Sequence, residues 1–160
     1  MQTKIIEYSD IDVLRKKLDT KKIVLVGGCF DIFHYGHHTF LTAAKKTGDV
    51  LIVALESDLF IQTRKKKNPV HTQQQRAELL ASTHTVDYVI KLPYFSTDKE
   101  YSDLVQSVKP HSIAVTKGDV SLDKKKKQAD LIGATVVEVT PIIGSFSSSN
   151  IVSYENISSD

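Results

Sequence analysis

The chain is 160 residues long, with 41% hydrophobic and 25% charged residues, which are proportions typical of a globular protein of one domain. It contains no apolar stretch long enough to span a bilayer, and its first residues are mixed and polar, so we expect no secretory leader. The single cysteine, Cys29, excludes an internal disulfide and suits a reducing compartment. We therefore expect a cytoplasmic protein without a membrane partner. The net charge of +2 is too small to indicate a nucleic-acid partner.

Apolar strands and amphipathic helices alternate along the chain. The first strand, 23–26, is a β-branched apolar run that ends at Gly27, and a helix with apolar residues at helical spacing is predicted at 36–46. The predicted elements that follow are strand 50–55, helix 72–82, strand 88–92, helix 99–108, strand 112–115, helix 124–132 and strand 135–139. This alternation predicts an α/β fold with a parallel sheet covered by helices on both faces.

The whole chain, 1–160, is predicted to form one domain, because it contains no linker and no internal repeat. Its core is expected at about 20–152. Residues 1–20 are interpreted as an added N-terminal extension with a helix at 11–18, and 153–160 as a polar tail.

The turn between residues 27 and 37 is the segment best suited to chemistry. It reads GGCFDIFHYGH, and ligands of parallel sheets bind beyond the carboxyl ends of the strands. The glycines let a ligand approach the backbone, and His34 and His37 can face one side where the helix begins. The turn therefore predicts a phosphate site. Zinc is disfavoured because it needs three or four ligands and Cys29 is the only thiol.

Two runs of basic residues occur later in the chain. Arg64-Lys65-Lys66-Lys67 follows the strand at 50–55, and Lys124-Lys125-Lys126-Lys127 falls on the predicted helix at 124–132. Such runs are usually solvated, which is our interpretation of the second run. The first run is also a candidate for holding phosphate.

Several motifs occur in an order that is typical of one family. The segment GGCFDIFHYGH resembles the HxGH signature of the cytidylyltransferase-like nucleotidyltransferases, and the resemblance covers about residues 20–152. Further segments similar to motifs of that family are AKKTGD at 44–49, ESD at 56–58, NPVHTQQQR at 68–76, VDYV at 86–89, KGD at 117–119 and SSSNI at 147–151. A lone HxGH motif is a weak signal, whereas this ordered set is specific.

The resemblance implies a Rossmann-like fold and an enzyme that transfers an NMP from a nucleoside triphosphate to a phosphorylated small molecule, releasing pyrophosphate. The acceptor phosphate is already an anion, so the reaction needs alignment and charge neutralisation rather than a serine or cysteine nucleophile. The resemblance also implies Mg²⁺ bound with the triphosphate, although it names no metal ligand. Members of this family often form homodimers.

The resemblance also assigns roles to particular residues. His34 and His37 are implied to contact the triphosphate and stabilise the transition state, and Lys66 or Lys67 to clamp it from a mobile basic loop. Arg64 is implied to contact the acceptor phosphate, for which Lys45 on the helix at 36–46 is a second candidate. The residues implied to bind the nucleotide are Gly28, Cys29, Phe30, His34, His37, Arg76, Lys117, Gly118, Asp119, Ser147, Ser148 and Ser149.

Some of these residues also have structural interpretations. Arg76 can pair with Asp58 or Glu78, residues 117–119 can form an ordinary turn, a serine of 147–149 can cap a helix, and Cys29 is interpreted as a packing or backbone-contact residue.

Within the superfamily the sequence looks most like the heptose-1-phosphate adenylyltransferase domain, which favours ATP over CTP and a sugar phosphate as acceptor. The alternatives are a CTP-dependent cytidylyltransferase acting on glycerol 3-phosphate or a similar alcohol phosphate, and an FAD synthetase-like adenylyltransferase. The former usually has an arginine where this chain has Ile142. Two alternatives belong to other classes of protein. The first is a nucleotide-binding domain without catalysis, which the histidines and the basic loop argue against. The second is a nucleic-acid-binding protein, which is disfavoured because this chain has no basic stripe interleaved with aromatic residues.

Overall fold

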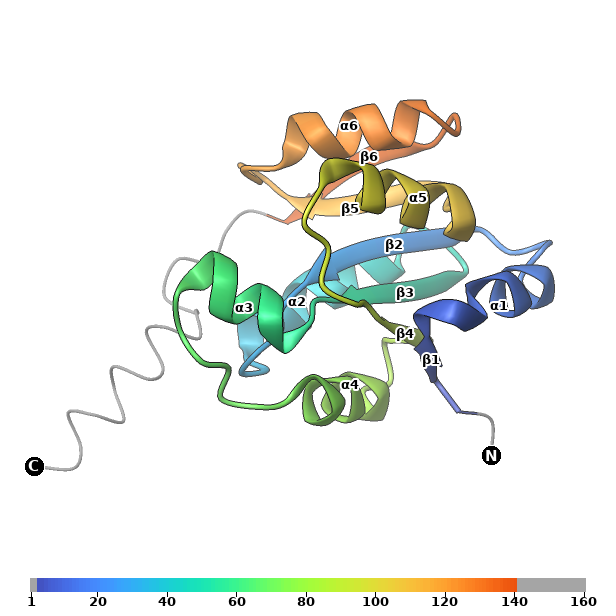
Figure 1. Ribbon diagram of the computed structural model, residues 1–160. Coiled ribbons are helices and arrows are strands. Elements are labelled where there is room, and N and C mark those ends of the chain that lie inside the picture. Colours follow the sequence, from blue (N-terminus) through green and yellow to red (C-terminus); the bar gives the residue numbers. More distant parts are fainter. Residues whose placement is uncertain (1–2, 141–160) are drawn as a thin grey trace, which may run out of the picture.

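The protein folds as a six-stranded parallel sheet, seen in a computed structural model that describes residues 3–140 (Figure 1). The strand order is β1-β4-β3-β2-β5-β6. The strands are β1 (Ile5–Glu7), β2 (Ile23–Gly28), β3 (Val50–Leu55), β4 (Tyr88–Lys91), β5 (Ser112–Thr116) and β6 (Thr135–Thr140). The helices are α1 (Ile11–Lys17), α2 (Tyr35–Lys45), α3 (Asp58–Lys65), α4 (Gln73–Ser82), α5 (Asp98–Val108) and α6 (Leu122–Asp130). The predicted Rossmann-like α/β fold is confirmed.

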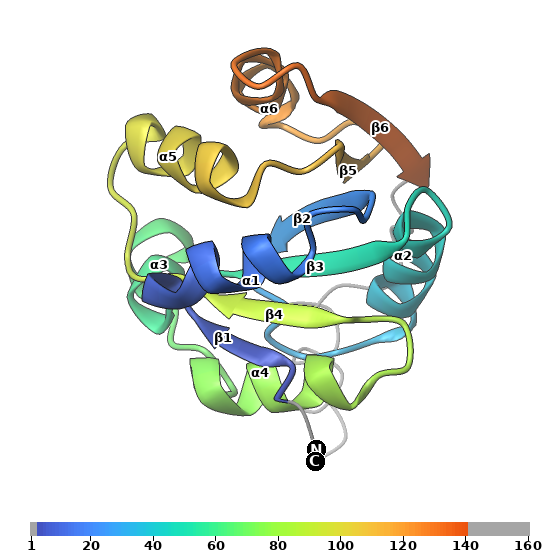
Figure 2. The same ribbon diagram turned by 90° about the vertical axis from the view of Figure 1, so that its right-hand side faces the viewer.

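Helices cover both faces of the sheet, with α1, α5 and α6 on one side and α2 and α4 on the other (Figure 2). The alternation of side chains along each strand sends neighbouring residues into different cores. In β2, Ile23 and Leu25 pack in the core beneath α1 and α5, while Val24 and Val26 pack beneath α2 and α4. Burial on both faces explains why the central strands β2 and β3 are apolar rather than alternating.

One strand and one α-helix were not predicted, and each is short. Strand β1 has three residues and pairs with β4 at the edge of the sheet, so the N-terminal segment supplies more than the added helix that we expected. Helix α3 spans Asp58–Lys65 and has Ile61 as its buried residue. Its N-cap is Ser57, whose Oγ accepts a hydrogen bond from the Phe60 backbone N–H at 3.1 Å. None of the helices within 3–140 has the length and apolar character needed to cross a membrane.

From β2 the chain adds β3 and β4 on one side, and it then returns to add β5 and β6 on the other side of β2. The sheet opens at this change of direction, between β2 and β5. Strand β2 pairs with β3 over six residues, from Ile23 to Gly28. Its pairing with β5 involves only two residues, Val24 with Ser112 and Leu25 with Ile113. The carboxyl halves of β2 and β5 therefore separate, and this switch point is where ligands of doubly wound sheets bind.

Candidate active site

Two adjoining cavities lie at the carboxyl ends of β2 and β5. The smaller, of about 210 Å³, lies over the turn that follows β2 and is lined by His37 and Lys67 among others. The larger, of about 680 Å³, extends toward α3, α5 and α6. The residues that line both cavities, and so mark their junction, are Gly27, Gly28, Cys29, Lys65, Asp119 and Lys125.

His34 and His37 form a stacked pair at the first turn of α2. His34 is the N-cap residue, and its Nδ1 accepts a hydrogen bond from the His37 backbone N–H at 3.4 Å. The two imidazole rings are 3.7 Å apart between centroids and 21° from parallel. His37 lines the smaller cavity, so the helix N-terminus and an imidazole face the same space. The two histidines thus lie together at the helix N-terminus as predicted, but His37 lines a cavity and His34 lines neither of the two.

The electrostatic environment of His37 keeps its imidazole neutral. Burial is the main cause that lowers its pKa to about 3, the charges of His34 and Lys65 lower it further, and a backbone hydrogen bond with Ile32 opposes them. Its buried Nδ1 has no hydrogen-bond partner within residues 3–140. A neutral imidazole with an unsatisfied nitrogen beside a cavity is suited to hydrogen-bond a ligand there.

Phe30 supports the ring of His37 from the adjacent turn. The two rings are 4.8 Å apart between centroids, and Phe30 adopts a left-handed backbone conformation with φ of 46°. Such a conformation is costly for a bulky residue and tends to occur at functional sites. A Cβ atom on Gly28 would lie 2.8 Å from the Phe30 ring, so glycine at position 28 makes room for this arrangement.

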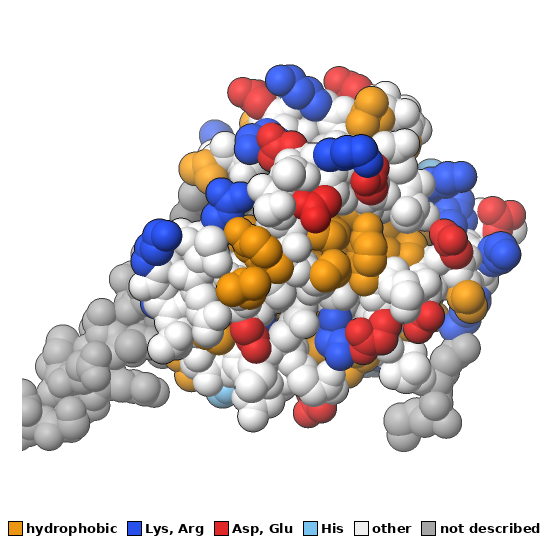
Figure 3. All heavy atoms as spheres, viewed as in Figure 1, with side chains coloured by type: hydrophobic (Ala, Val, Ile, Leu, Met, Phe, Trp, Pro, Cys, Tyr) orange, Lys and Arg blue, Asp and Glu red, His pale blue; other side chains and the backbone are white. Residues whose placement is uncertain are grey.

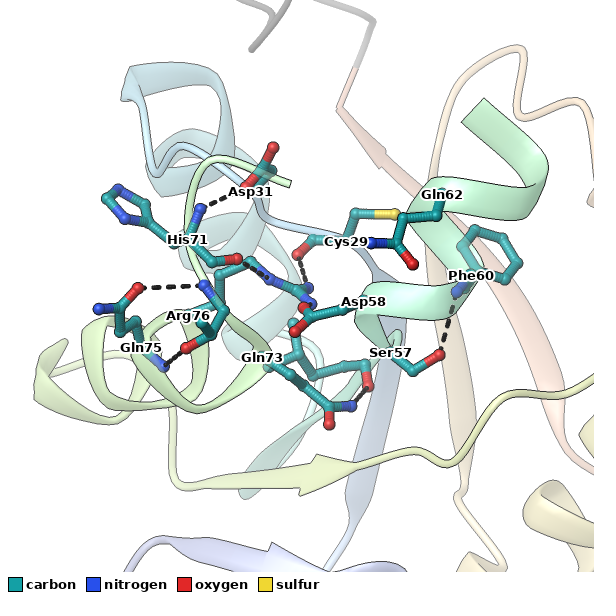
Figure 4. A network of polar contacts seen from close by, with 12 residues as sticks. Cys29, Asp31, Ser57, Asp58, Phe60, Gln62, His71, Gln73, Gln75 and Arg76 are labelled. Atoms are coloured by element: carbon teal, nitrogen blue, oxygen red, sulfur yellow. Dashed lines mark hydrogen bonds and ion pairs between the residues drawn. The ribbon is translucent and has the colours of Figure 1, made fainter. Parts of the chain in front are cut away.

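Arg76 lies beneath the site, which corrects its prediction as a nucleotide-binding residue (Figure 4). Its side chain is fully buried and lines neither cavity. The guanidinium donates to the Cys29 carbonyl at 2.6 Å and to the His71 carbonyl at 3.1 Å, and it forms an ion pair with Asp58 at 2.7 Å. Since all three partners are protein groups, Arg76 is a positioning residue that joins α4 to the turn after β2.

Asp31, which the sequence analysis did not single out, ties a second segment to the same turn. Its buried carboxylate accepts hydrogen bonds from the backbone N–H groups of Val70, at 2.9 Å, and His71, at 3.1 Å. Asp31 also lines the smaller cavity. Only the fold brings residues 31 and 70 together, although the aspartate within the HxGH segment was a visible signal.

The basic run at 64–67 is divided by the end of α3. Arg64 and Lys65 are in the helix, which corrects the expectation that the whole run forms a loop, and Lys66 ends the helix with φ of 55°. Lys67 lines the smaller cavity, whereas the exposed Lys66 lines neither, which argues against Lys66 as the clamp. Lys65 lines both cavities, and Arg64 lines the larger one as expected for a contact with the acceptor.

Lys45 lies at the amino-terminal ends of the strands, away from the cavities, which corrects its prediction as an acceptor-phosphate ligand. Its Nζ forms an ion pair with the Asp87 carboxylate at 2.6 Å, just before β4, and also donates to the Asp49 carbonyl. The physical reason is that α2 runs antiparallel to the strands. Its first turn lies at their carboxyl ends, and its last turn lies at their amino ends.

The turn after β5 contributes Asp119 and Gly118 to the cavities, while the exposed Lys117 lines neither. Gly118 has φ of 79°, a conformation that glycine adopts without strain. Asp119 accepts a hydrogen bond from the Ser121 backbone N–H and pairs with Lys125 Nζ, both at 2.7 Å. Lys125 therefore belongs to the site, and our interpretation of Lys124–Lys127 as an entirely solvated face is wrong at this position.

The thiol of Cys29 and the late serines complete the predicted set. Cys29 is buried, and burial raises the pKa of its thiol while the charge of Lys65 opposes that shift. Its carbonyl oxygen is held by Arg76, in line with the structural interpretation of this cysteine. Ser147, Ser148 and Ser149 lie outside the described residues.

Glu56, which directly follows β3, is a buried carboxyl group that the sequence analysis did not assign to the site. It lines the larger cavity, and its Oε1 accepts a hydrogen bond from the Tyr101 hydroxyl at 2.8 Å. Burial raises the pKa of Glu56 to about 7. The opposing influences are the Tyr101 hydrogen bond and the positive charges of Arg76, Lys125 and Arg64 on the helices around it.

This raised pKa predicts a pH-dependent cost of folding. Because the folded pKa of about 7 lies above the reference value of 4.5, the free energy of unfolding should fall as pH rises through that interval, by about 3 kcal/mol in total. Glu56→Gln removes this titration. In denaturant unfolding at pH 4.5 and pH 8, we expect wild type to lose about 3 kcal/mol relative to the variant; parallel pH profiles would contradict the assignment.

At the switch point of this parallel sheet, an imidazole pair, a helix N-terminus and lysine side chains lie around adjoining cavities. This architecture is that of a nucleotidyltransferase, in which no covalent intermediate is needed. Comparison with known families agrees with this class. The cytidylyltransferase-like family model matches residues 25–159, so the chain belongs to the cytidylyltransferase-like family.

Two bacterial relatives are similar to this chain over most of its length. It is 37% identical over 140 residues to the bifunctional protein HldE of a Nitratiruptor species, covering 86% of this chain and 28% of that protein. It is 38% identical over 152 residues to the bifunctional protein HldE of Campylobacter jejuni subsp. jejuni serotype O:2, covering 94% and 31%. The chain thus spans less than a third of the length of these relatives.

Two solved structures share the fold. The lipopolysaccharide core biosynthesis protein of Thermoplasma volcanium has a TM-score of 0.61 and 27% identity, covering 76% of this chain and 96% of that one. The pantoate-beta-alanine ligase of Francisella tularensis has a TM-score of 0.63 and 16% identity, covering 98% and 78%, and this second likeness shows the fold alone.

Proposed function

We propose that the protein transfers AMP from ATP to a sugar phosphate, forming an ADP-linked sugar and pyrophosphate. The observation that carries the proposal is the pair of adjoining cavities, which meet at Lys65, Asp119 and Lys125. The smaller cavity, beside the imidazole pair and the start of α2, suits the triphosphate, and the larger one suits the acceptor. The similarity to HldE proteins over most of the chain supports an adenylyltransferase acting on a sugar phosphate.

The reaction that we propose is a single in-line displacement. An oxygen of the acceptor phosphate bonds to the α-phosphorus of ATP as the bond to the bridging oxygen breaks, and that electron pair leaves with pyrophosphate. The ring of His37 contacts the triphosphate from the smaller cavity, and Lys65 and Lys67 offset the charge of the triphosphate. Arg64 and Lys125, which line the acceptor cavity, hold the acceptor phosphate in line.

Mg²⁺ is proposed to enter with the triphosphate, held by phosphate oxygens and water. Within residues 3–140 no group of three or more His, Cys, Asp or Glu side chains is arranged to hold a metal ion. The ion supplies charge neutralisation, and no protein ligand is assigned to it.

Pyrophosphate release tests the proposed function. The protein is incubated with Mg²⁺ and either ATP or CTP, together with heptose 1-phosphate, glycerol 3-phosphate or FMN. We expect release with ATP and heptose 1-phosphate, at a rate well above that of every other pair. Release with CTP and glycerol 3-phosphate alone would reject the assigned substrates, and no release from any pair would reject the activity.

A further inference from the structure

The second oxygen of the Glu56 carboxyl group is buried without a partner. Glu56 is only 7% exposed. Tyr101 satisfies Oε1, but Oε2 has no hydrogen-bond partner among the residues that the structure describes. A buried polar atom without a partner costs free energy, and natural proteins keep few of them. Because Glu56 lines the larger cavity, a molecule in that cavity can supply the missing hydrogen bond.

The walls around Glu56 restrict what this molecule is. Hydrophobic side chains gather in the middle of the face shown in Figure 3, and Phe60, Leu104 and Val105 are among the apolar residues that line the larger cavity. Such walls suit the C–H faces of a ring or carbon chain. The ligand portion beside Glu56 is therefore a carbon skeleton that carries hydrogen-bonding groups.

The charges in the cavity fix the direction in which a phosphorylated ligand lies. The buried carboxyl group of Glu56 offers a phosphate no positive charge, and it repels a phosphate once it is ionised, so the phosphate is better placed elsewhere in the cavity. The cations that line the same cavity provide its place. They are Arg64 and Lys65 on α3, together with Lys124 and Lys125 on α6, which pair with Asp98 and Asp119. The opposite, uncharged end of the ligand then faces the carboxyl group of Glu56.

We propose that Glu56, held by Tyr101, is the specificity-determining residue for the acceptor and binds a hydroxyl group on its carbon skeleton through Oε2. The ligand class is a polyhydroxylated phosphate rather than a simple alkyl phosphate. This inference rests on the proposed function for the identity of the reaction, but its test measures binding and does not require turnover.

The test compares two acceptors of equal charge by isothermal titration, with a non-hydrolysable ATP analogue present. One is heptose 1-phosphate, and the other is cyclohexyl phosphate, whose six-membered ring carries no hydroxyl group. We expect wild type to bind the sugar phosphate at least about tenfold more tightly. In Glu56→Leu, whose side chain cannot hydrogen-bond a hydroxyl group, this preference should fall to near one or below, with binding of the ATP analogue unchanged.

Two further variants separate recognition from folding. Glu78→Gln changes an exposed glutamate on α4 that lines neither cavity, and it should keep the full preference. Tyr101→Phe leaves the Glu56 carboxyl in place but removes its anchor, and it should reduce the preference only in part. If Glu56→Leu does not fold, as judged by thermal unfolding, Tyr101→Phe carries the test.

Several results would overturn the inference. No preference in wild type, or an unchanged preference in the Glu56 and Tyr101 variants, overturns the inference. Weaker binding of the ATP analogue would also overturn it, because Glu56 would then act on the nucleotide. An equal loss of affinity for both acceptors would overturn it too, because Glu56 would then only support the structure of the cavity. Absence of pyrophosphate release by wild type rejects the proposed function, whatever the titrations show.

Discussion

His37→Ala is expected to lower turnover at least about a hundredfold while leaving the fold intact. Stacking on His34 and contact with Phe30 fix the His37 ring beside the smaller cavity before any ligand arrives. Each preorganised donor lost from a site of developing charge typically costs about 2.7–4 kcal/mol of barrier. In the ligand-free protein the pKa of His37 is lowered to about 3, so the ring is neutral before a triphosphate binds.

The measurement is steady-state pyrophosphate release, with thermal unfolding as the check on folding. His38→Ala provides a matched control, since His38 is the next residue of α2 but is exposed and lines neither cavity. We expect the control to keep turnover within about twofold of wild type. Near-normal turnover of His37→Ala would remove the central role assigned to the histidine pair.

Arg76→Leu is expected to lower the free energy of unfolding by about 3–5 kcal/mol. The substitution leaves the Cys29 and His71 carbonyls and the Asp58 carboxylate without their shared donor. Asp58 is 38% exposed in its side chain and can regain water, so most of the loss comes from the two carbonyls and the space left in the core. The turn that carries the predicted phosphate site loses its support, so the rate of pyrophosphate release should fall as well.

Denaturant unfolding at pH 7 measures this effect, with Arg76→Lys and Asp58→Asn as the matched variants. Lysine keeps the charge but cannot reach three acceptors from one planar group, so its loss should be intermediate. Asp58→Asn removes only the partly exposed partner and should cost less than Arg76→Leu. A loss below about 1 kcal/mol for Arg76→Leu would show that the buried network does not support the turn.

Local sequence patterns were sufficient for the strands and the longer helices. The strand at 50–55 has the predicted bounds, and β2 and β5 differ from prediction by two residues or fewer at each end. These elements are apolar because the sheet is covered on both faces, and a run of consecutive apolar residues can be recognised from the sequence alone. The three residues of β1 are too few to form a pattern. Helix α3 was missed because its last residues, Arg64 and Lys65, belong to a basic run that we interpreted as a loop.

The sequence by itself determined the fold class, the family and the candidate site at 27–37, because a strand, a glycine turn and a helix N-terminus are consecutive along the chain. Only the tertiary structure decided which distant side chains reach that turn. It placed Lys65, Lys125 and Glu56 around the cavities, Arg76 beneath them and Lys45 at the amino-terminal ends of the strands. The physical reason is that convergence depends on strand order and on the direction of each helix across the sheet. Neither property is visible in the spacing of residues along one segment.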